Sequence, residues 1–405
     1  CDVLRWRQES VTPRPAAKGQ PPVGPQPRRC SPPAAGPSYP FSPAAAGTCA
    51  LANRPESDYI FDQGELPWNA EPTPQPRELP LPRAPVTVRL RPGAGEYPMS
   101  LGSQPRFRLG TLPTPLHELP RLRAALGGPG RCPRILVKRD DLTGLALGGN
   151  KVRKLEFIVG EALRDGATFL VTAGAVQSNH CRLTAAAARI AGLGVALVLG
   201  TTADEPQLQG NLLLDTLLGA ELHFFRMQPG QSAALAARAE AARVDEVLDE
   251  LRARGERPSF APVGGSTATG ALGYVAASLE LIGQLADASE SPSWLYYASG
   301  SRGTQAGLAL GARLYGAPYR LRGIAVSGGE SEKREIARRI AGEAAERLGR
   351  DVRLEDDELI TDEGYIGEGY GIPSPAAIEA IRLLARTEAI FLDPVYSAKA
   401  MAGLI

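Results

Sequence analysis

The residues best suited to chemistry are two lysines three positions apart, Lys151 and Lys154, which directly follow a Gly-Gly-Asn break at 148–150. Glycines let a backbone approach a ligand closely, and a helix starting there would hold the first lysine in place. A lysine that is desolvated or close to other cations can be a free amine near neutral pH. Lys154 and Arg153 supply such cations. Lys151 is therefore a candidate nucleophile, although an isolated Lys-x-x-Lys pair is most often a solvated surface feature.

A second candidate is the run 299–304 (SGSRGT), which lies between a predicted strand and a predicted helix. Backbone N–H groups at a helix N-terminus converge on anions, and the hydroxyls of Ser301 and Thr304 add donors. The run matches neither a Walker P-loop nor a dinucleotide fingerprint. Alone it is most simply a tight turn. With a candidate lysine upstream, it predicts a phosphate site.

Two further groups of polar residues have ordinary structural explanations. The run 177–180 (QSNH) lies between a strand and a helix, where Ser and Asn commonly cap the helix. A histidine such as His180 is more often structural than catalytic. Tyr370 and Tyr396 could simply pack in a core with their hydroxyls bonded. Their context in the chain raises their importance.

Four segments in this order, 138–157, 172–182, 297–307 and 393–401, together resemble one family of enzymes. It is the pyridoxal-phosphate family that joins 1-aminocyclopropane-1-carboxylate (ACC) deaminase and D-cysteine desulfhydrase. The resemblance begins near Phe107 and continues to the last residue. It implies an α/β chain of fold type II, similar to the tryptophan synthase β subunit, with parallel sheets flanked by helices. It also implies a pyridoxal 5'-phosphate cofactor in a cleft between two domains, a small amino-acid substrate and a homodimer.

The resemblance also implies roles for single residues. Lys151 would carry the cofactor as a Schiff base, and Asn179 would hydrogen-bond the cofactor's phenolic oxygen. Tyr396 would act as an acid, a base or an activator of the leaving group, with Tyr370 as a second aromatic wall. The phosphate would be held by Lys154, Gly300, Ser301, Arg302, Gly303 and Thr304. The substrate would contact Gln177, Ser178, Asn179, His180 and Tyr396, and the catalytic set would be Lys151, Ser178, Tyr370 and Tyr396.

Two chemistries then compete. A desulfhydrase eliminates the β-substituent of D-cysteine and yields pyruvate, ammonia and hydrogen sulfide. A deaminase opens a cyclopropane ring and yields 2-oxobutanoate and ammonia, which would also place the chain among hydrolases. The deaminase branch carries a glutamate after the tyrosine that Tyr396 matches, and here that position is Ser397. Together with His180 this favours a D-cysteine desulfhydrase, or a relative such as an L-cysteate sulfo-lyase.

Hydrophobic periodicity predicts an α/β fold with two domains. A large cofactor domain is expected over 105–164 and 265–405, with a small βαβ domain inserted over 165–264. Buried strands are predicted at 169–172, 195–199, 222–225, 294–297 and 323–326. Helices are predicted at 151–165, 185–190, 212–218, 234–254 and 305–315.

The first hundred residues differ in composition from the rest. They hold more than half of the 36 prolines and show no useful periodicity, so residues 1–100 are predicted to be a disordered leader. An organelle transit peptide is a weaker alternative. Because the chain starts with Cys1 and ends before a family segment whose threonine meets the pyridine nitrogen, we expect a fragment. A truncated, inactive cofactor-binding homologue is the non-enzyme alternative.

Composition excludes several other classes of protein. A formal net charge of +1 gives no electrostatic reason to bind nucleic acid or an anionic membrane. No window approaches the ~20 apolar residues of a membrane-spanning helix. The five cysteines and three histidines are scattered, so neither a disulfide framework nor a metal site is expected, and a cytoplasmic location is predicted.

Overall fold

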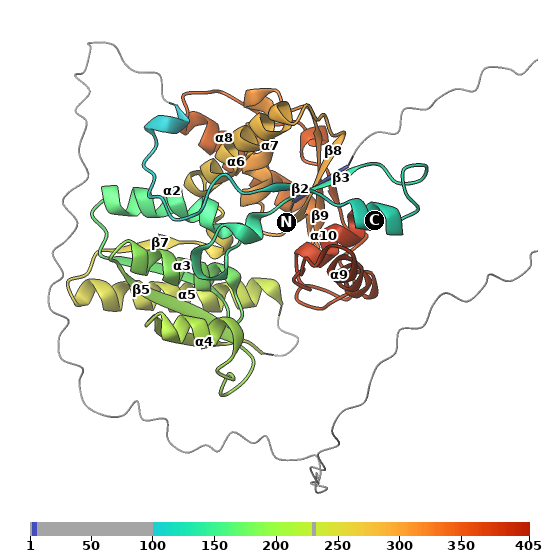
Figure 1. Cartoon of the computed structure of the whole chain (residues 1–405). Coiled ribbons are helices and arrows are strands. Elements are labelled where there is room, and N and C mark those ends of the chain that lie inside the picture. Colours follow the sequence, from blue (N-terminus) through green and yellow to red (C-terminus); the bar gives the residue numbers. More distant parts are fainter. Residues whose placement is uncertain (1, 6–99, 229–231) are drawn as a thin grey trace, which may run out of the picture. The chain divides into compact units, whose positions relative to one another are not determined.

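The structure is a computed structural model that describes residues 2–5, 100–228 and 232–405. These residues belong to one compact unit built on two β-sheets (Figure 1). The predicted α/β class with helix-flanked parallel strands is confirmed. No helix of the described residues is both long enough and apolar enough to cross a lipid bilayer.

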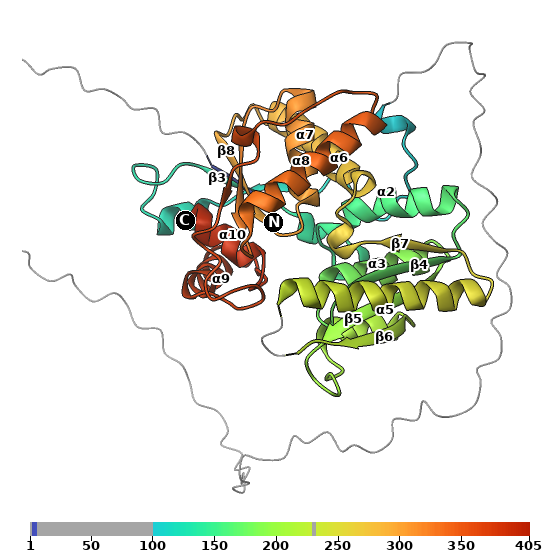
Figure 2. The ribbon, with the colours of Figure 1, turned by 180° about the vertical axis from the view of Figure 1, so that it is seen from behind.

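The smaller sheet is entirely parallel, with the strand order β6-β5-β4-β7. Its strands are β4 (Phe169–Ala175), β5 (Gly194–Thr201), β6 (Glu221–Arg226) and β7 (Pro258–Ala261). Alternate residues of the central strands face opposite sides, as the period of two requires. Leu170 and Leu197 pack toward the α2 and α3 side, whereas Val171 and Ala196 pack against Val244 of α5. Both faces are therefore covered by helices, and α5 crosses one of them (Figure 2).

The larger sheet is mixed and has the order β10-β9-β8-β1-β3-β2. Its strands are β1 (Asp2–Arg5), β2 (Leu116–Glu118), β3 (Ile135–Lys138), β8 (Trp294–Ser299), β9 (Arg320–Ala325) and β10 (Thr361–Asp362). Strands β8, β9 and β10 pair in parallel, while the pairs that involve β1 or β2 are antiparallel. One core cluster joins this sheet to α6, α7 and α8, and another joins it to α1, α9 and α10.

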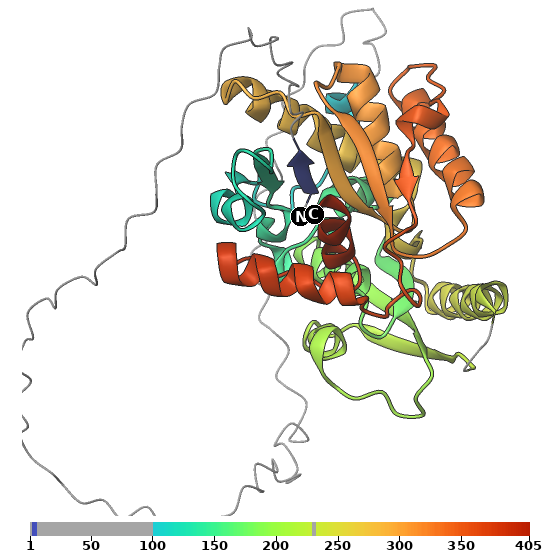
Figure 3. The ribbon, with the colours of Figure 1, turned by 90° about the vertical axis from the view of Figure 1, so that its right-hand side faces the viewer.

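The strand β1 corrects part of the prediction for the first hundred residues. Asp2–Arg5 lies in the larger sheet between β3 and β8 (Figure 3), although the sequence analysis assigned it to the disordered leader. A four-residue segment has no periodicity to detect, and backbone pairing with two neighbours is what orders it. Apart from β1 and Ser100, the predicted leader lies outside the described residues.

Ten helices are described, and several begin at the side-chain caps that sequence rules favour. Ser178, Ser232, Thr267 and Ser374 each accept a hydrogen bond from the backbone N–H of the third residue of the helix that follows. The helices are α1 (Pro120–Ala125), α2 (Lys151–Arg164), α3 (Asn179–Ile190), α4 (Gly210–Leu217), α5 (Ala233–Ala253), α6 (Ala268–Asp287), α7 (Gly303–Tyr315), α8 (Glu330–Arg347), α9 (Pro375–Glu388) and α10 (Ser397–Leu404).

A buried network of charges fixes the first turn of α2. The Arg153 guanidinium donates from Nε and Nη2 to the carboxylate of Asp140, at 2.9 and 2.8 Å, and also reaches both carboxylate oxygens of Glu280 on α6. Lys138 donates to Glu280 at 2.5 Å, and the Tyr274 hydroxyl donates to Asp140 at 2.9 Å. Because every charged member has an oppositely charged partner, the network anchors α2 to α6 without an isolated buried charge.

Candidate active site

One cavity of about 580 Å³ brings most of the predicted site residues together. Its lining comes from the turn before α2, the start of α3, the 299–304 run and the segment before α10. The predicted residues that line it are Lys151, Ser178, Asn179, His180, Gly300, Ser301, Arg302, Thr304, Tyr370 and Tyr396. Gln177, Lys154 and Gly303 do not line it, and their positions are described below.

Lys151 is the first residue of α2 and projects into this cavity. The turn before it has positive φ at Gly148 and Gly149, where glycine avoids the strain of a Cβ, and Arg182 donates to the carbonyl of Gly148 at 3.1 Å. Burial lowers the pKa of Lys151 to about 8, against the opposing effect of the Asp393 carboxylate. A substantial fraction of this amine is therefore unprotonated slightly above neutral pH.

Lys154 lies beside the N-terminus of α7, one turn along α2 from Lys151. Its Nζ donates to the carbonyl oxygen of Gly264 at 3.0 Å, and a Cβ added to Gly303 would lie 3.0 Å from that nitrogen. Burial, and then the charge of Lys151, hold the pKa of Lys154 well below its usual range. A lysine side chain facing the positive end of a helix, with no carboxylate among its hydrogen-bond partners, forms a site for an anion.

A second glycine loop, 262–267 (PVGGST), completes this anion site and was not identified from the sequence. The hydroxyls of Ser266 and Ser301 are 2.7 Å apart, and the N–H of Gly303 donates to Ser266 Oγ at 3.3 Å. Gly264 has a φ of 71°, and a Cβ there would lie 2.4 Å from Ser301 Oγ. The signal that could have revealed it is the repeated pattern of a strand, a Gly-Ser-rich turn and a helix.

Arg302 lines the cavity through its position in the loop, but its guanidinium is bound elsewhere. The residue has a φ of 71° and its side chain is almost fully buried. The guanidinium donates to Ser299 at 2.8 Å, to Gln305 at 2.8 Å and to the carboxylate of Glu330. The side chain thus ties α7 to neighbouring elements, and only the backbone of Arg302 is placed to meet an anion.

The run 177–180 divides its residues between two environments. Ser178 caps α3 by accepting from the N–H of Cys181 at 3.3 Å, and Asn179 faces the cavity. Gln177 instead points to α4, where its Nε2 donates to the carbonyl of Gln209 at 3.0 Å. The two ring nitrogens of His180 are buried and make no hydrogen bond to the described residues.

His180 is held in its neutral form. Burial, followed by the charges of Lys151 and Lys154, lowers the pKa of His180 to about 3. The ring therefore adds no positive charge to the site at neutral pH. A neutral imidazole can still donate one hydrogen bond and accept another.

Two tyrosines also line this cavity. The hydroxyls of Tyr370 and Tyr396 are 2.5 Å apart, and Lys151 Nζ lies 6.0 Å from the centre of the Tyr396 ring. Burial, with smaller effects from Tyr370 and Asp393, raises the pKa of Tyr396 far above its usual range. Tyr396 consequently keeps its proton at neutral pH and can donate a hydrogen bond from its hydroxyl.

The turn that carries Tyr396 is built around Asp393. This carboxylate accepts from the backbone N–H of Tyr396 at 2.7 Å and from the hydroxyl of Ser397 at 2.6 Å. Ser397 lines the cavity, but its hydroxyl already has this strong acceptor. Ser397 therefore serves first to order the turn.

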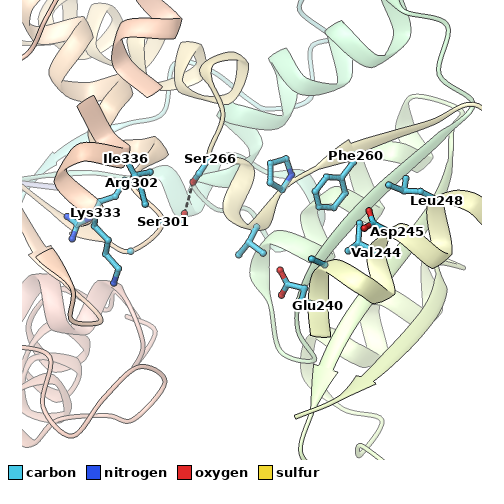
Figure 4. A pocket seen from close by; sticks show the side chains of 14 residues that line it. Glu240, Val244, Asp245, Leu248, Phe260, Ser266, Ser301, Arg302, Lys333 and Ile336 are labelled. Carbon is cyan, nitrogen blue, oxygen red and sulfur yellow. Dashed lines mark hydrogen bonds between the residues drawn. The ribbon is translucent and has the colours of Figure 1, made fainter. Parts of the chain in front are cut away.

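A second cavity, of about 470 Å³, lies next to the two glycine loops (Figure 4). Its walls come from α5 with Phe260 on one side and from α8 with Arg302 on the other. Figure 4 shows the bonded hydroxyls of Ser266 and Ser301 between these two groups of side chains. This cavity adjoins the one that contains Lys151, because Val263, Gly300, Ser301, Arg302 and Lys333 line both. Among the described residues, no group of three or more His, Cys, Asp or Glu side chains could hold a metal ion.

Comparison with known proteins identifies relatives that match about three quarters of the chain. D-cysteine desulfhydrases of Salmonella choleraesuis (strain SC-B67) and Salmonella typhi are each 44% identical over 309 residues, which is 74% of this chain and 88% of theirs. A crystal structure described as an ACC deaminase homologue is 37% identical, with a TM-score of 0.64, over 75% of this chain and 87% of its own.

These relatives support a lyase and correct the prediction of a hydrolase, because a desulfhydrase breaks a carbon–sulfur bond. The predicted homodimer and cytoplasmic location are not tested by them and stay predictions. Residues 107–405 match the family model described as "Pyridoxal-phosphate dependent enzyme". Together with the lysines and glycine loops of the cavity, this match shows that the chain belongs to the pyridoxal-phosphate-dependent enzymes.

Proposed function

We propose that the chain is a D-cysteine desulfhydrase that converts D-cysteine and water into pyruvate, ammonia and hydrogen sulfide. The observation that carries this proposal is the pair of desolvated lysines, one in the cavity and one in the anion site, in a chain that is 44% identical to D-cysteine desulfhydrases. The pair offers a reactive amine and a phosphate site one helical turn apart. Few other chemistries need both at this spacing.

The residues present fit pyridoxal phosphate. Lys151 would hold the cofactor through its amine, and the phosphate would lie among Lys154, the 262–267 loop and the start of α7. Asn179, which lines the same cavity, would hydrogen-bond the phenolic oxygen. The fit rests on the unpaired cation in the anion site, since a dianionic phosphate would offset the desolvation of Lys154.

Bound pyridoxal phosphate supplies an electron sink that stabilises negative charge at the substrate's α-carbon. Lys151, with a pKa near 8, would take the α-proton as a general base. Tyr396 would donate a hydrogen bond to the departing sulfur, with Tyr370 holding its hydroxyl in place. Ser178 and the N-terminus of α3 would bind the substrate carboxylate. Lys151 would thus serve twice, whereas each of the other groups would have one task.

Ser397 supports the elimination over the ring-opening alternative. Position 397 carries a hydroxyl and not a carboxylate, and this hydroxyl donates to Asp393. The resemblance associates ring opening with a glutamate at this position. We therefore expect Ser397→Glu to lower sulfide release from D-cysteine.

The experiment is to measure sulfide and keto-acid release from D-cysteine, L-cysteine, cysteate and ACC. Sulfide with pyruvate from D-cysteine, lost about a thousandfold or more in Lys151→Ala, is the expected result. Arg121→Ala is the control, since it removes an exposed positive charge outside the cavity. Release of 2-oxobutanoate from ACC without sulfide from D-cysteine would replace the proposal with the deaminase. Release of sulfite from cysteate alone would replace it with a sulfo-lyase.

We also propose the domain division expected from the sequence, with a large domain over 105–164 and 265–405 and a small domain over 165–264. All four strands of the smaller sheet lie within 165–264, which supports the division. A homodimer is proposed by resemblance to the family. Sedimentation of the purified chain would test it, and a single monomeric species at micromolar concentration would contradict it.

A further inference from the structure

The side chain of Asn211 connects α4 to Gln177 and Asn179, two residues predicted to bind the substrate or the cofactor. Asn211 is the second residue of α4, outside the cavity lining. Its Nδ2 donates to the backbone carbonyl of Gln177 at 2.7 Å and to Oδ1 of Asn179 at 3.0 Å. Its backbone N–H donates to Oε1 of Gln177 at 2.9 Å.

The carbonyl of Gln177 determines which way these two carboxamides are turned. A backbone carbonyl can only accept, so the atom of Asn211 facing it must be the nitrogen. The second hydrogen of that nitrogen points to Asn179, and the atom that receives it must be an oxygen. The remaining atom of the Asn179 carboxamide is therefore its nitrogen, which is a donor. Because Asn179 lines the cavity, this donor is available to a ligand there.

We propose that Asn211 is a positioning residue, which fixes the carboxamide of Asn179 so that its nitrogen is presented to the phenolic oxygen of pyridoxal phosphate. The inference rests on the proposed function, because it assumes that Asn179 meets this oxygen. A donor at the oxygen withdraws electron density from it. This lowers the basicity of the Lys151 nitrogen next to it, and so sets the pH at which the absorbance of the loaded enzyme changes.

The test compares Asn211→Asp with the wild-type holoenzyme by pH titration of the cofactor absorbance. A carboxylate at position 211 cannot donate, so the Asn179 carboxamide turns over to donate to it and presents its oxygen to the cavity. We expect the midpoint of the absorbance change to rise by about one pH unit or more. We also expect pyridoxal phosphate to bind about tenfold more weakly, as measured by fluorescence.

Two further variants separate positioning from a general loosening of α4. Leu212→Ala removes the buried neighbour of Asn211 without touching Asn179, and its midpoint should equal that of the wild type. In an Asn179→Ala background, Asn211→Asp should shift the midpoint no further. If Asn211→Asp does not fold, Asn211→Ala replaces it, with a smaller rise expected from the lost donor.

Several results would overturn the inference. An unchanged midpoint in Asn211→Asp would do so, as would an equal shift in Leu212→Ala or a full shift in the Asn179→Ala background. Wild-type chain that bound no pyridoxal phosphate would overturn the proposed function together with this inference. Normal binding with an unchanged midpoint would overturn the inference alone.

Discussion

Two faces of the first turn of α2 carry buried cations in opposite circumstances. Arg153 points to one side, where Asp140 and Glu280 bind it. Lys151 and Lys154 are three positions apart and hence lie on a common side, where the Nζ of Lys154 donates to a neutral acceptor, the carbonyl oxygen of Gly264. The pKa of Arg153 is raised, whereas those of Lys151 and Lys154 are lowered.

This difference in pairing shows how a functional site can be distinguished from a structural network that contains the same types of charged residue. A paired buried charge is part of the folded state, and removing its partner costs stability. An unpaired buried charge lowers the stability of the folded state until an anionic ligand binds to it. Substitutions on the two faces should therefore change stability in opposite directions.

The largest change is expected on the paired face. Asp140→Ala leaves the buried guanidinium of Arg153 without its closest partner, and the unfolding free energy should fall by about 3–5 kcal/mol. Denaturation by urea measures it. Asp165→Ala removes an exposed carboxylate that pairs with Arg164 and should leave the unfolding free energy nearly unchanged. Equal losses in the two variants would contradict the distinction.

Much of this arrangement was predictable from the sequence, because the decisive signals are local. The Gly-Gly-Asn break predicted the position of Lys151, and the Ser-Gly-Ser turn predicted the start of α7. The parallel strands β4, β5, β6, β8 and β9 were also predicted, since continuous apolar runs are typical of buried parallel strands.

What could not be predicted depends on distant partners. The helices α6 and α8 were not predicted, nor was the direction of the Gln177 and Arg302 side chains. The sequence around Gln177 cannot show that its carboxamide is hydrogen-bonded at the start of α4, some thirty residues later. Likewise, the role of Ser266 depends on its contact with Ser301, which is 35 residues away.

A smaller effect is expected in the pH dependence of the unfolding free energy, measured on the chain freed of cofactor. Burial lowers the pKa of Lys151 from 10.5 to about 8, so between these values the unfolded chain binds the proton that the folded chain has lost. Stability therefore rises with pH across this window, by about 3 kcal/mol in all, and the full penalty applies below pH 8.

Comparison with Lys151→Met isolates this contribution. Cys181 and Tyr396 have raised pKa values, so their titration lowers stability in alkaline solution and opposes the trend. Both residues are present in the variant, and the difference between the two stability curves cancels them. We expect Lys151→Met to be the more stable chain at pH 7 and the advantage to disappear near pH 10.5. A constant difference across this range would contradict a desolvated Lys151.

The smallest change in stability is expected at the anion site, where a substitution should raise stability but weaken ligand binding. Lys154→Met removes a buried amine but keeps an unbranched side chain of similar length, and it gives up one hydrogen bond to Gly264. Loss of the desolvation penalty should outweigh the lost bond, so the chain freed of cofactor should gain about 1 kcal/mol. The same variant should bind pyridoxal phosphate and inorganic phosphate more weakly, because the phosphate loses its cation. A variant that is both less stable and unchanged in phosphate affinity would place Lys154 with the structural charges of the other face.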